Sequence, residues 1–131
     1  REAAVLLPLC TIGGQPSVLF TVRSMSLSTH QGEISFPGGM RDPTDPSPEY
    51  TSLRETFEEI HIDPDRIAIL GGTHAVPNVD GTIRVHPYIG VIDGGAPLDP
   101  GTLKYNRAEL SKVFGLSVAE LLDPDCRTMV P

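Results

Sequence analysis

The sequence predicts a mixed fold, α/β or α+β, in which short strands pack with one strong amphipathic helix. Apolar, β-compatible runs recur along the chain, and one segment near its middle has helical periodicity instead. The 131 residues include 13 glycines and 13 prolines, which favour a turn-rich chain over a helical bundle. The length corresponds to one domain, and a hydrophobic fraction of 39% is enough for a core.

The first two strands are expected to form a hairpin. Residues 3–10 and 17–22 are apolar, and the turn-forming segment 13–16 (GGQP) separates them. Pro8 lies inside the first run, which predicts an edge strand or a bulge because proline has no backbone N–H to donate.

The region before the helix combines loops with one short strand. Residues 23–32 are polar and predict a loop, and residues 33–36 alternate and predict a short strand. The segment 37–39 (PGG) is expected to break this strand, and an acidic loop follows at 41–46.

The helix is expected to begin directly after Ser47. Ser47 is a good N-cap, and Pro48 suits the first helical position because its missing N–H would be unpaired there anyway. The helical pattern ends before Pro64, at about residue 60 to 62.

The residues of this helix divide onto two faces. At about 100° per residue, three carboxylates share an arc of roughly 100°. They belong to Glu55, Glu58 and Glu59. The apolar side chains are expected on the opposite side, and they are Tyr50, Leu53, Phe57 and Ile60. The apolar face is therefore predicted to pack on the sheet, with the carboxylates projecting from the other side.

The second half of the chain predicts two more strands and a short helix. The β-type runs 67–76 and 82–92 are joined by a turn at 78–81 (NVDG), and residues 93–106 predict a loop. Ser117 and Glu120 have the spacing of a capping box, so a short helix is expected at 118–122.

The three clustered carboxylates repel one another, because like charges on adjacent helical turns are destabilising. A hard divalent cation takes oxygen ligands, would relieve this repulsion and suits a site that also contacts substrate phosphates. A solvated acidic face is the alternative explanation, because charge runs are usually solvated.

The segment 39–62 resembles the Nudix box, G-x5-E-x7-R-E-U-x-E-E-x-G-U, in which U is aliphatic. Here it reads Gly39-x5-Asp45-x8-Arg54-Glu55-Thr56-Phe57-Glu58-Glu59-Ile60-His61-Ile62. The R-E-x-x-E-E centre is intact. Asp45 stands where glutamate is usual, one extra residue precedes Arg54, and His61 replaces a glycine that normally caps the helix.

An upstream stretch is similar to the one that marks the coenzyme A diphosphatase branch of Nudix hydrolases. It comprises residues 21–24 (TVRS), Leu27 and residues 30–39 (HQGEISFPGG), followed by Asp42 and Asp45. A basic residue is usual after Leu27, where this chain has Ser28. A weaker similarity continues through residues 106–114, so the resemblance covers most of the chain.

The resemblance implies a single Nudix domain over residues 1–131, with an α/β/α sandwich fold, a mixed sheet and the catalytic helix at about 47–61. Both ends are expected to be cut, because the chain starts at Arg1 just before an apolar run and stops directly after Met129 and Val130. It implies metal-dependent hydrolysis of the pyrophosphate bond of coenzyme A or acyl-CoA, giving 3′,5′-ADP and (acyl-)4′-phosphopantetheine. Relatives in this branch are typically peroxisomal or mitochondrial.

Two alternatives stay open. A hydrolase of oxidised dNTPs would use the same catalytic helix, and a catalytically silent Nudix-fold binding module would keep only the fold. The intact glutamates of the motif argue against the silent module.

The resemblance also implies roles for the residues of the motif. Glu55, Glu58 and Glu59 are expected to bind Mg²⁺ or Mn²⁺, with Gly39 offering a backbone carbonyl. Arg54 keeps its proton at all relevant pH values and is expected to orient a neighbouring glutamate. The general base is expected to be Glu55 or Glu109, although a solvated surface acid is at least as good an account of Glu109.

The candidate substrate-binding residues are Arg23, His30, Gln31 and Gly38. His30, Gln31 and Gly38 lie in the stretch that marks the coenzyme A branch. Arg23 could donate charge-assisted hydrogen bonds to phosphate, and the alternative is a surface arginine at the end of a strand.

The charge balance limits the partners. The 17 acidic residues outnumber the 10 lysines and arginines, which gives a formal net charge of −7. This argues against nucleic acid and anionic lipid as partners, and no apolar run is long enough to span a membrane. A small molecule is the expected partner, and the sequence does not indicate an oligomeric state. Cys10 and Cys126 are expected to be free thiols.

The expected substrate is itself an anion, which the acidic helix would repel. Its binding should therefore depend steeply on a metal ion. The obvious direct phosphate partners are Arg23, Arg41, Arg84 and Arg107.

Overall fold

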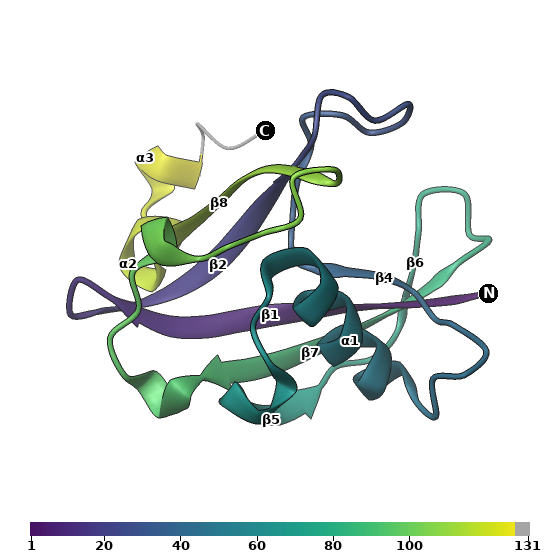
Figure 1. Ribbon diagram of the computed structural model, residues 1–131, viewed down its shortest axis with the longest axis horizontal. Coiled ribbons are helices and arrows are strands. Elements are labelled where there is room, and N and C mark those ends of the chain that lie inside the picture. The colour runs from purple at the N-terminus through teal and green to yellow at the C-terminus, as the bar shows by residue number, and fades with distance from the viewer. Residues whose placement is uncertain (128–131) are drawn as a thin grey trace.

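The computed structural model describes residues 1–127, which form a mixed sheet with one long helix against it (Figure 1). The strands are β1 (Glu2–Ile12), β2 (Gln15–Arg23), β3 (Ile34–Ser35), β4 (Gly38–Met40), β5 (Ile67–Gly72), β6 (Val76–Pro77), β7 (Arg84–Ile92) and β8 (Leu110–Ser117). The α-helices are α1 (Pro48–Ile60), α2 (Val118–Leu122) and α3 (Pro124–Arg127), and 3₁₀ turns lie at Pro64–Arg66, Asp93–Gly95 and Pro100–Thr102.

The sheet has the strand order β3-β2-β1-β7-β5, with β4 on β1, β6 on β7 and β8 on β2. The pairing of β1 with β7 is parallel, and β1 pairs antiparallel with β2 and β4. The expected α/β class with a mixed sheet is confirmed.

The hairpin is present, but the role predicted for Pro8 is wrong. β1 and β2 pair antiparallel only over residues 9–12 and 15–18, and β4 pairs with residues 3–5 of β1. β1 is a central strand, and Pro8 is fully buried beside Gly90 of β7. Proline is tolerated there because it lies in the gap between the two antiparallel neighbours, where neither pairs with it.

The segment 37–39 also differs from the expectation. Instead of only breaking the chain, Gly38 and Gly39 form β4 against β1. A Cβ on Gly38 would collide with the backbone oxygen of Ala4, so glycine permits this close approach. The strand expected over 67–76 ends at residue 72, and β6 follows as a separate short strand.

Helix α1 begins and ends as the sequence predicts. The Ser47 side chain accepts a hydrogen bond from the backbone N–H of Tyr50 at 3.1 Å, and Pro48 is the first helical residue. His61 occupies the left-handed C-cap position with φ 57°, and its N–H donates to the Phe57 carbonyl at 3.0 Å. The histidine thus takes the conformation that glycine usually supplies, at some cost in backbone strain.

The face that α1 turns to the sheet is not the one expected. Its buried residues are Thr51, Ser52, Thr56, Glu59 and Ile60. Tyr50 and Phe57 are 49% and 48% exposed. Of the four residues of the predicted apolar face, only Ile60 is fully buried. The Ser52 hydroxyl donates to the Glu49 carbonyl and the Thr56 hydroxyl to the Ser52 carbonyl, each at 2.7 Å. Because the helix backbone satisfies these hydroxyls, a face of small polar residues can be buried.

The apolar core lies around the C-terminal end of α1. Its buried members are Cys10, Leu19, Ile60, Ile62, Ile92, Leu110 and Val113. Cys10 is a free thiol whose pKa burial raises to about 11, and the side chain of Cys126 lies outside the described residues. The capping box of Ser117 and Glu120 is confirmed at the start of α2. Within residues 1–127, no helix has the length and apolar character to cross a membrane.

The packing of α1 leads to a prediction about stability. Replacing the fully buried Ile60 with alanine should lower the free energy of unfolding by about 2–5 kcal/mol, because it leaves a cavity in the core. Replacing the half-exposed Phe57 with alanine should cost roughly 1 kcal/mol or less. Urea denaturation measures both values, and equal losses would contradict the observed orientation of the helix.

Candidate active site

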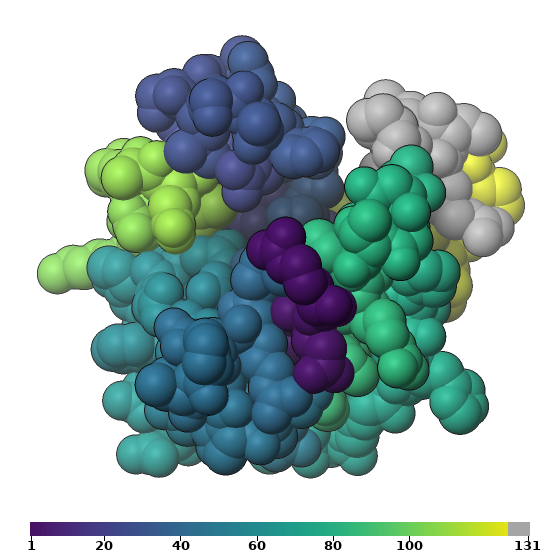
Figure 2. Space-filling model, turned by 90° about the vertical axis from the view of Figure 1, so that its right-hand side faces the viewer, coloured from purple at the N-terminus to yellow at the C-terminus, as the bar shows by residue number. Residues whose placement is uncertain are grey.

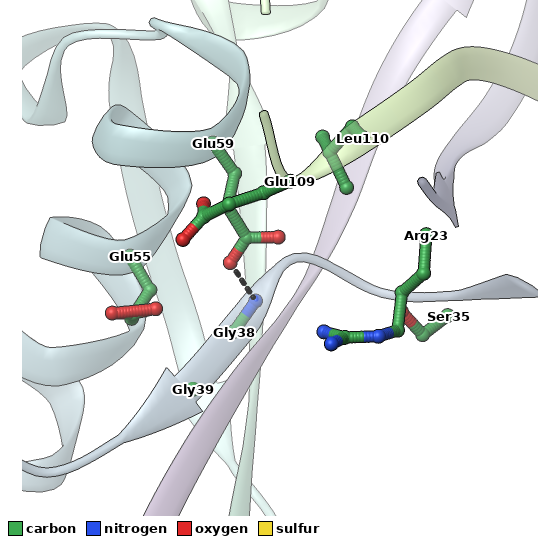
Figure 3. Close-up of a pocket in the computed structure, with 8 residues that line it drawn as sticks. All are labelled: Arg23, Ser35, Gly38, Gly39, Glu55, Glu59, Glu109 and Leu110. Carbon is green, nitrogen blue, oxygen red and sulfur yellow. Dashed lines mark hydrogen bonds between the residues drawn. The ribbon is translucent and has the colours of Figure 1, made fainter. Parts of the chain in front are cut away.

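A cavity of about 180 Å³ lies where β1 and β2 separate (Figure 3). It is lined by Arg23, Ser35, Gly38, Gly39, Glu55, Glu59, Glu109 and Leu110. Helix α1 contributes Glu55 and Glu59, and the residue directly before β8 contributes Glu109. Arg23 ends β2 on the opposite side of the cavity. Of the predicted site residues, the structure thus brings together these four with Gly38 and Gly39.

Main-chain hydrogen bonds hold the wall that carries Glu109. The N–H of Ser24 donates to the Glu109 carbonyl, and the N–H of Asn106 donates to the Glu59 carbonyl, each at 2.8 Å. The segment after β2 and the segment before β8 consequently lie side by side above α1 (Figure 2). This contact brings Glu109 to the helix although 50 residues separate it from Glu59 in the sequence.

Glu59 is the most deeply buried of the three carboxylates. The residue is 8% exposed, and its Oε2 accepts a hydrogen bond from the N–H of Gly38 at 3.1 Å. Burial, aided by the charges of Glu55 and Glu109, raises the pKa of Glu59 to about 8, although the hydrogen bond from Gly38 and the charge of Arg23 oppose the shift. Burial also raises the pKa of Glu55.

Asp45 anchors Arg54. Its buried carboxylate, 1% exposed, accepts hydrogen bonds from Nε and Nη2 of Arg54, both at 2.9 Å. The Thr51 hydroxyl donates to the same carboxylate at 2.8 Å and the N–H of Asp42 at 2.9 Å. The bidentate pair holds the pKa of Asp45 well below its usual range and that of Arg54 above its own.

The remaining donors of Arg54 reach the glutamates. Its Nη1 donates to Glu55 at 3.0 Å and to Glu58 at 2.8 Å. Arg54 therefore contacts two glutamates, as expected of an orienting residue. The Glu58 side chain is 49% exposed and turned to Arg54, and it does not line the cavity.

The donor set of the cavity fits a hard divalent cation. Glu55, Glu59 and Glu109 face one small space, and the raised pKa values of Glu55 and Glu59 reflect burial and negative charge that existing partners do not offset. Such cations prefer carboxylate and carbonyl oxygens. With the side chains as they stand, the part of the chain that the structure describes has no group of three or more His, Cys, Asp or Glu already arranged around a metal position.

Two predicted substrate-binding residues lie outside the cavity. His30 is exposed, and its Nδ1 lies 2.9 Å from Glu33 Oε1. Gln31 lines a separate hollow with residues 32–34. The sequence resemblance marked this loop, but the structure does not bring His30 or Gln31 next to the carboxylates.

Three residues have places in the site that the sequence alone does not predict. Ser35 and Leu110 line the cavity, and Asp45 anchors Arg54. In the sequence, Asp45 and Ser35 are part of the stretch that marks the coenzyme A branch, but no role in the site follows from their positions alone. The pairing of Ser35 with Thr21 of β2, which turns β3 toward the cavity, is a tertiary fact.

Comparisons with known proteins find a matching family model and curated relatives. The NUDIX domain family model matches residues 1–129. The chain is 40% identical over 122 residues to the human mitochondrial coenzyme A diphosphatase NUDT8, which covers 92% of this chain and 50% of that protein. It is 37% identical over 125 residues to the mouse peroxisomal coenzyme A diphosphatase NUDT7, covering 95% and 50%. The chain spans about half the length of these curated relatives.

Solved structures share the fold. A Nudix hydrolase from M. smegmatis, RenU, superimposes with a TM-score of 0.71 at 21% identity and covers all of this chain and 88% of its own. An Ap4A hydrolase from C. elegans superimposes with a TM-score of 0.70 at 15% identity, covering 98% and 91%. At these identities the likeness concerns the fold alone.

The contact between β4 and α1 gives a prediction about Gly39. A Cβ at this position would collide with the carboxylate of Glu55, so Gly39→Ala should displace Glu55. The affinity for Mg²⁺, measured by calorimetry, should fall roughly 10- to 100-fold. Gly71→Ala is the matched control because nothing lies within 4 Å of the added carbon, and its affinity should be unchanged. Equal affinities of the two variants would refute the importance of this contact.

The raised pKa of Glu59 predicts a pH dependence of stability without metal. The folded protein binds the Glu59 proton more tightly than the unfolded chain, whose carboxyl has a pKa near 4.5, so this stabilisation is complete below about pH 4.5 and is lost as the pH rises through about 8. The melting temperature in the presence of a chelator should fall over this window, and Glu59→Gln should flatten the fall. A wild-type curve that rises from pH 5 to 8 and is unchanged in Glu59→Gln would be inconsistent with a buried, protonated Glu59.

Proposed function

Because this chain belongs to the Nudix family, we propose that it hydrolyses the pyrophosphate bond of coenzyme A or acyl-CoA in a metal-dependent reaction. The products would be 3′,5′-ADP and 4′-phosphopantetheine or its acylated form. The observation that carries the proposal is the cavity in which Glu55, Glu59 and Glu109 face Arg23. The similarity to two coenzyme A diphosphatases over more than nine-tenths of the chain supports this choice of substrate.

In this proposal, Mg²⁺ or Mn²⁺ is held by Glu55 and Glu59, with Glu58 and the carbonyl of Gly39 as further ligands. When bound, such a cation neutralises phosphate oxygens and lowers the pKa of water, which is the chemistry that hydrolysis of a charged diphosphate requires. The half-exposed Glu58 would have to turn from Arg54 to join this set.

Hydrogen bonds between side chains hold the proposed catalytic groups in fixed positions. Asp45 fixes the guanidinium of Arg54 from one side, so that Nη1 is held against Glu55 and Glu58. Preorganised charges of this kind stabilise a transition state without reorganising during the reaction. Gly39 leaves the space in which the Glu55 carboxylate lies.

The general base is one of two carboxylates at the cavity. Glu55 lies on the rigid helix and is partly engaged by Arg54, whereas Glu109 is exposed and lies beside the helix, directly before β8. Either can accept the proton of an attacking water. Glu55→Gln and Glu109→Gln separate them, because loss of the base removes the acidic limb of the pH–rate profile.

The function is tested by incubating the protein with coenzyme A, 8-oxo-dGTP and ADP-ribose, each with and without Mg²⁺. We expect 3′,5′-ADP to form from coenzyme A only when Mg²⁺ is present. Glu59→Gln should reduce kcat about 100-fold or more, because it removes a charge from the proposed metal site. Glu49→Gln, on the exposed first turn of the same helix, is the matched control and should retain full activity.

Each other outcome would contradict a specific part of the proposal. Preferential turnover of 8-oxo-dGTP would favour the nucleotide-sanitising alternative, and turnover of none of the three would favour a silent binding module. Coenzyme A hydrolysis that survives Glu59→Gln unchanged would exclude the assigned metal ligands.

A further inference from the structure

Arg41 joins the first strand of the sheet to the loop that carries Asp45. Its Nη1 donates to the carboxylate of Glu2 at 2.7 Å, and its Nε and Nη2 donate to the carbonyl of Asp45 at 3.3 and 3.2 Å. The backbone N–H of Arg41 also donates to the carbonyl of Glu2 at 2.9 Å, which extends the pairing of β4 with β1. The sequence names Arg41 as a candidate phosphate partner, but these contacts engage all three nitrogens of its guanidinium, and it lies outside the lining of the cavity.

Glu2 is held in turn by the sheet. Its second oxygen, Oε2, lies 2.8 Å from Nε2 of His86 on β7, so one carboxylate bridges β7 and Arg41. Arg41 and then His86 hold the pKa of Glu2 below its usual range, which keeps the carboxylate charged. Figure 2 shows the N-terminal residues, in purple, between the blue segment before α1 and the green segment that leads into β7.

The exposure of this ion pair limits what it can do for the fold as a whole. The side chains of Glu2 and Arg41 are 36% and 31% exposed. Ion pairs that water reaches add little to global stability, because solvent screens them. The effect of the pair is therefore expected in the loop that Arg41 contacts.

Asp45 is held at both of its ends. Arg41 binds its carbonyl, and its carboxylate accepts from Nε and Nη2 of Arg54, both at 2.9 Å. The loop also closes on itself, because the N–H of Asp42 donates to the Asp45 carboxylate and the N–H of Asp45 to the Asp42 carbonyl, each at 2.9 Å. A shift in the main chain of Asp45 would therefore move the acceptor of Arg54, whose Nη1 contacts two glutamates of α1.

We infer that Arg41 is a positioning residue of the active site, with Glu2 as its support. It fixes the main chain of Asp45 and thereby the direction in which Arg54 presents its Nη1 donor to the glutamates. Outer partners of this kind commonly change activity although they touch no substrate. The inference rests on the proposed function for its effect on turnover, whereas the position of Arg54 can be measured with neither substrate nor metal.

The first measurement is hydrogen exchange at Nε of Arg54 in ¹⁵N-labelled, metal-free protein, which reports how often its pair with Asp45 opens. Arg41→Gln should speed this exchange roughly 10-fold, because the contacts it removes are charge-assisted but partly screened by water. Arg66→Gln is the matched control, since Arg66 is also partly exposed and donates two hydrogen bonds, here to the carboxylate of Asp93. Exchange at Arg54 should be the same in this control as in wild type.

Glu2 provides a second variant, which leaves Arg41 itself in the protein. Glu2→Ala should speed the exchange at Arg54 roughly 2- to 5-fold, the range for loss of a partly exposed ion pair. Glu2→Gln should restore most of the wild-type rate, because its amide oxygen still accepts from Arg41.

Hydrolysis of coenzyme A at saturating Mg²⁺ separates positioning from contact with substrate. Arg41→Gln should lower kcat roughly 10-fold and leave KM within about twofold of wild type, because it disturbs the catalytic groups and not the binding of substrate. Arg66→Gln should keep both values within about twofold of wild type. A higher KM at unchanged kcat in Arg41→Gln would identify a phosphate ligand and overturn the inference.

Two results of the exchange measurement would also overturn it. Arg54 could exchange in Arg41→Gln as it does in wild type, or the backbone amides of β2 could exchange faster by the same factor, which would indicate a general loss of stability. Failure of wild type to hydrolyse coenzyme A, with selective release of Arg54 in Arg41→Gln, would support the positioning role and reject only the proposed substrate.

Discussion

The site depends on the close approach of α1 to the two glycines of β4. Gly38 donates its N–H to Glu59, and Gly39 leaves the space that the carboxylate of Glu55 occupies. The same approach requires that α1 turn small residues to the sheet, since larger side chains at Thr51, Ser52 and Thr56 would hold the helix away. A polar helix face is thus buried, and it carries two carboxylates to the place where β1 and β2 separate.

Burying a charged carboxylate costs free energy, and only some of the buried carboxylates in this protein have partners that offset the cost. Asp45 is fully paired with Arg54, and its pKa is held low, whereas burial and mutual repulsion raise the pKa values of Glu55 and Glu59. The Asp45–Arg54 pair therefore needs no further partner, whereas the charges of Glu55 and Glu59 are not offset by their present neighbours, which fits the proposed metal site. Part of the acidic excess behind the formal net charge of −7 is therefore concentrated at the cavity. Under the proposed function, a bound cation would offset the repulsion between this wall and an anionic diphosphate, and Arg23 would add positive charge across the cavity.

The sequence predicts the structure correctly where local chemistry decides it. Ser47 and Pro48 set the start of α1, Ser117 and Glu120 cap α2, and the R-E-x-x-E-E pattern marks the acidic helix. It failed where long-range packing decides. Pro8 was expected at an edge, but it lies in a central strand because two partners of β1 leave a gap at that residue. The apolar stripe of α1 was expected to pack, but backbone carbonyls satisfy the hydroxyls of the opposite face and allow that face to be buried.

The sequence by itself determined the class of fold, the position and ends of α1, and the carboxylates of the candidate site, because helix caps, charge clusters and glycine pairs act over a few residues. Tertiary structure alone decided which of those residues meet. It brought Glu109 to Glu59, made Asp45 the anchor of Arg54 and left His30 and Gln31 outside the cavity. It also placed Arg23 at the cavity and left Arg41, Arg84 and Arg107 outside its lining. These outcomes follow from strand register and from main-chain bonds between distant segments, which residue spacing does not encode.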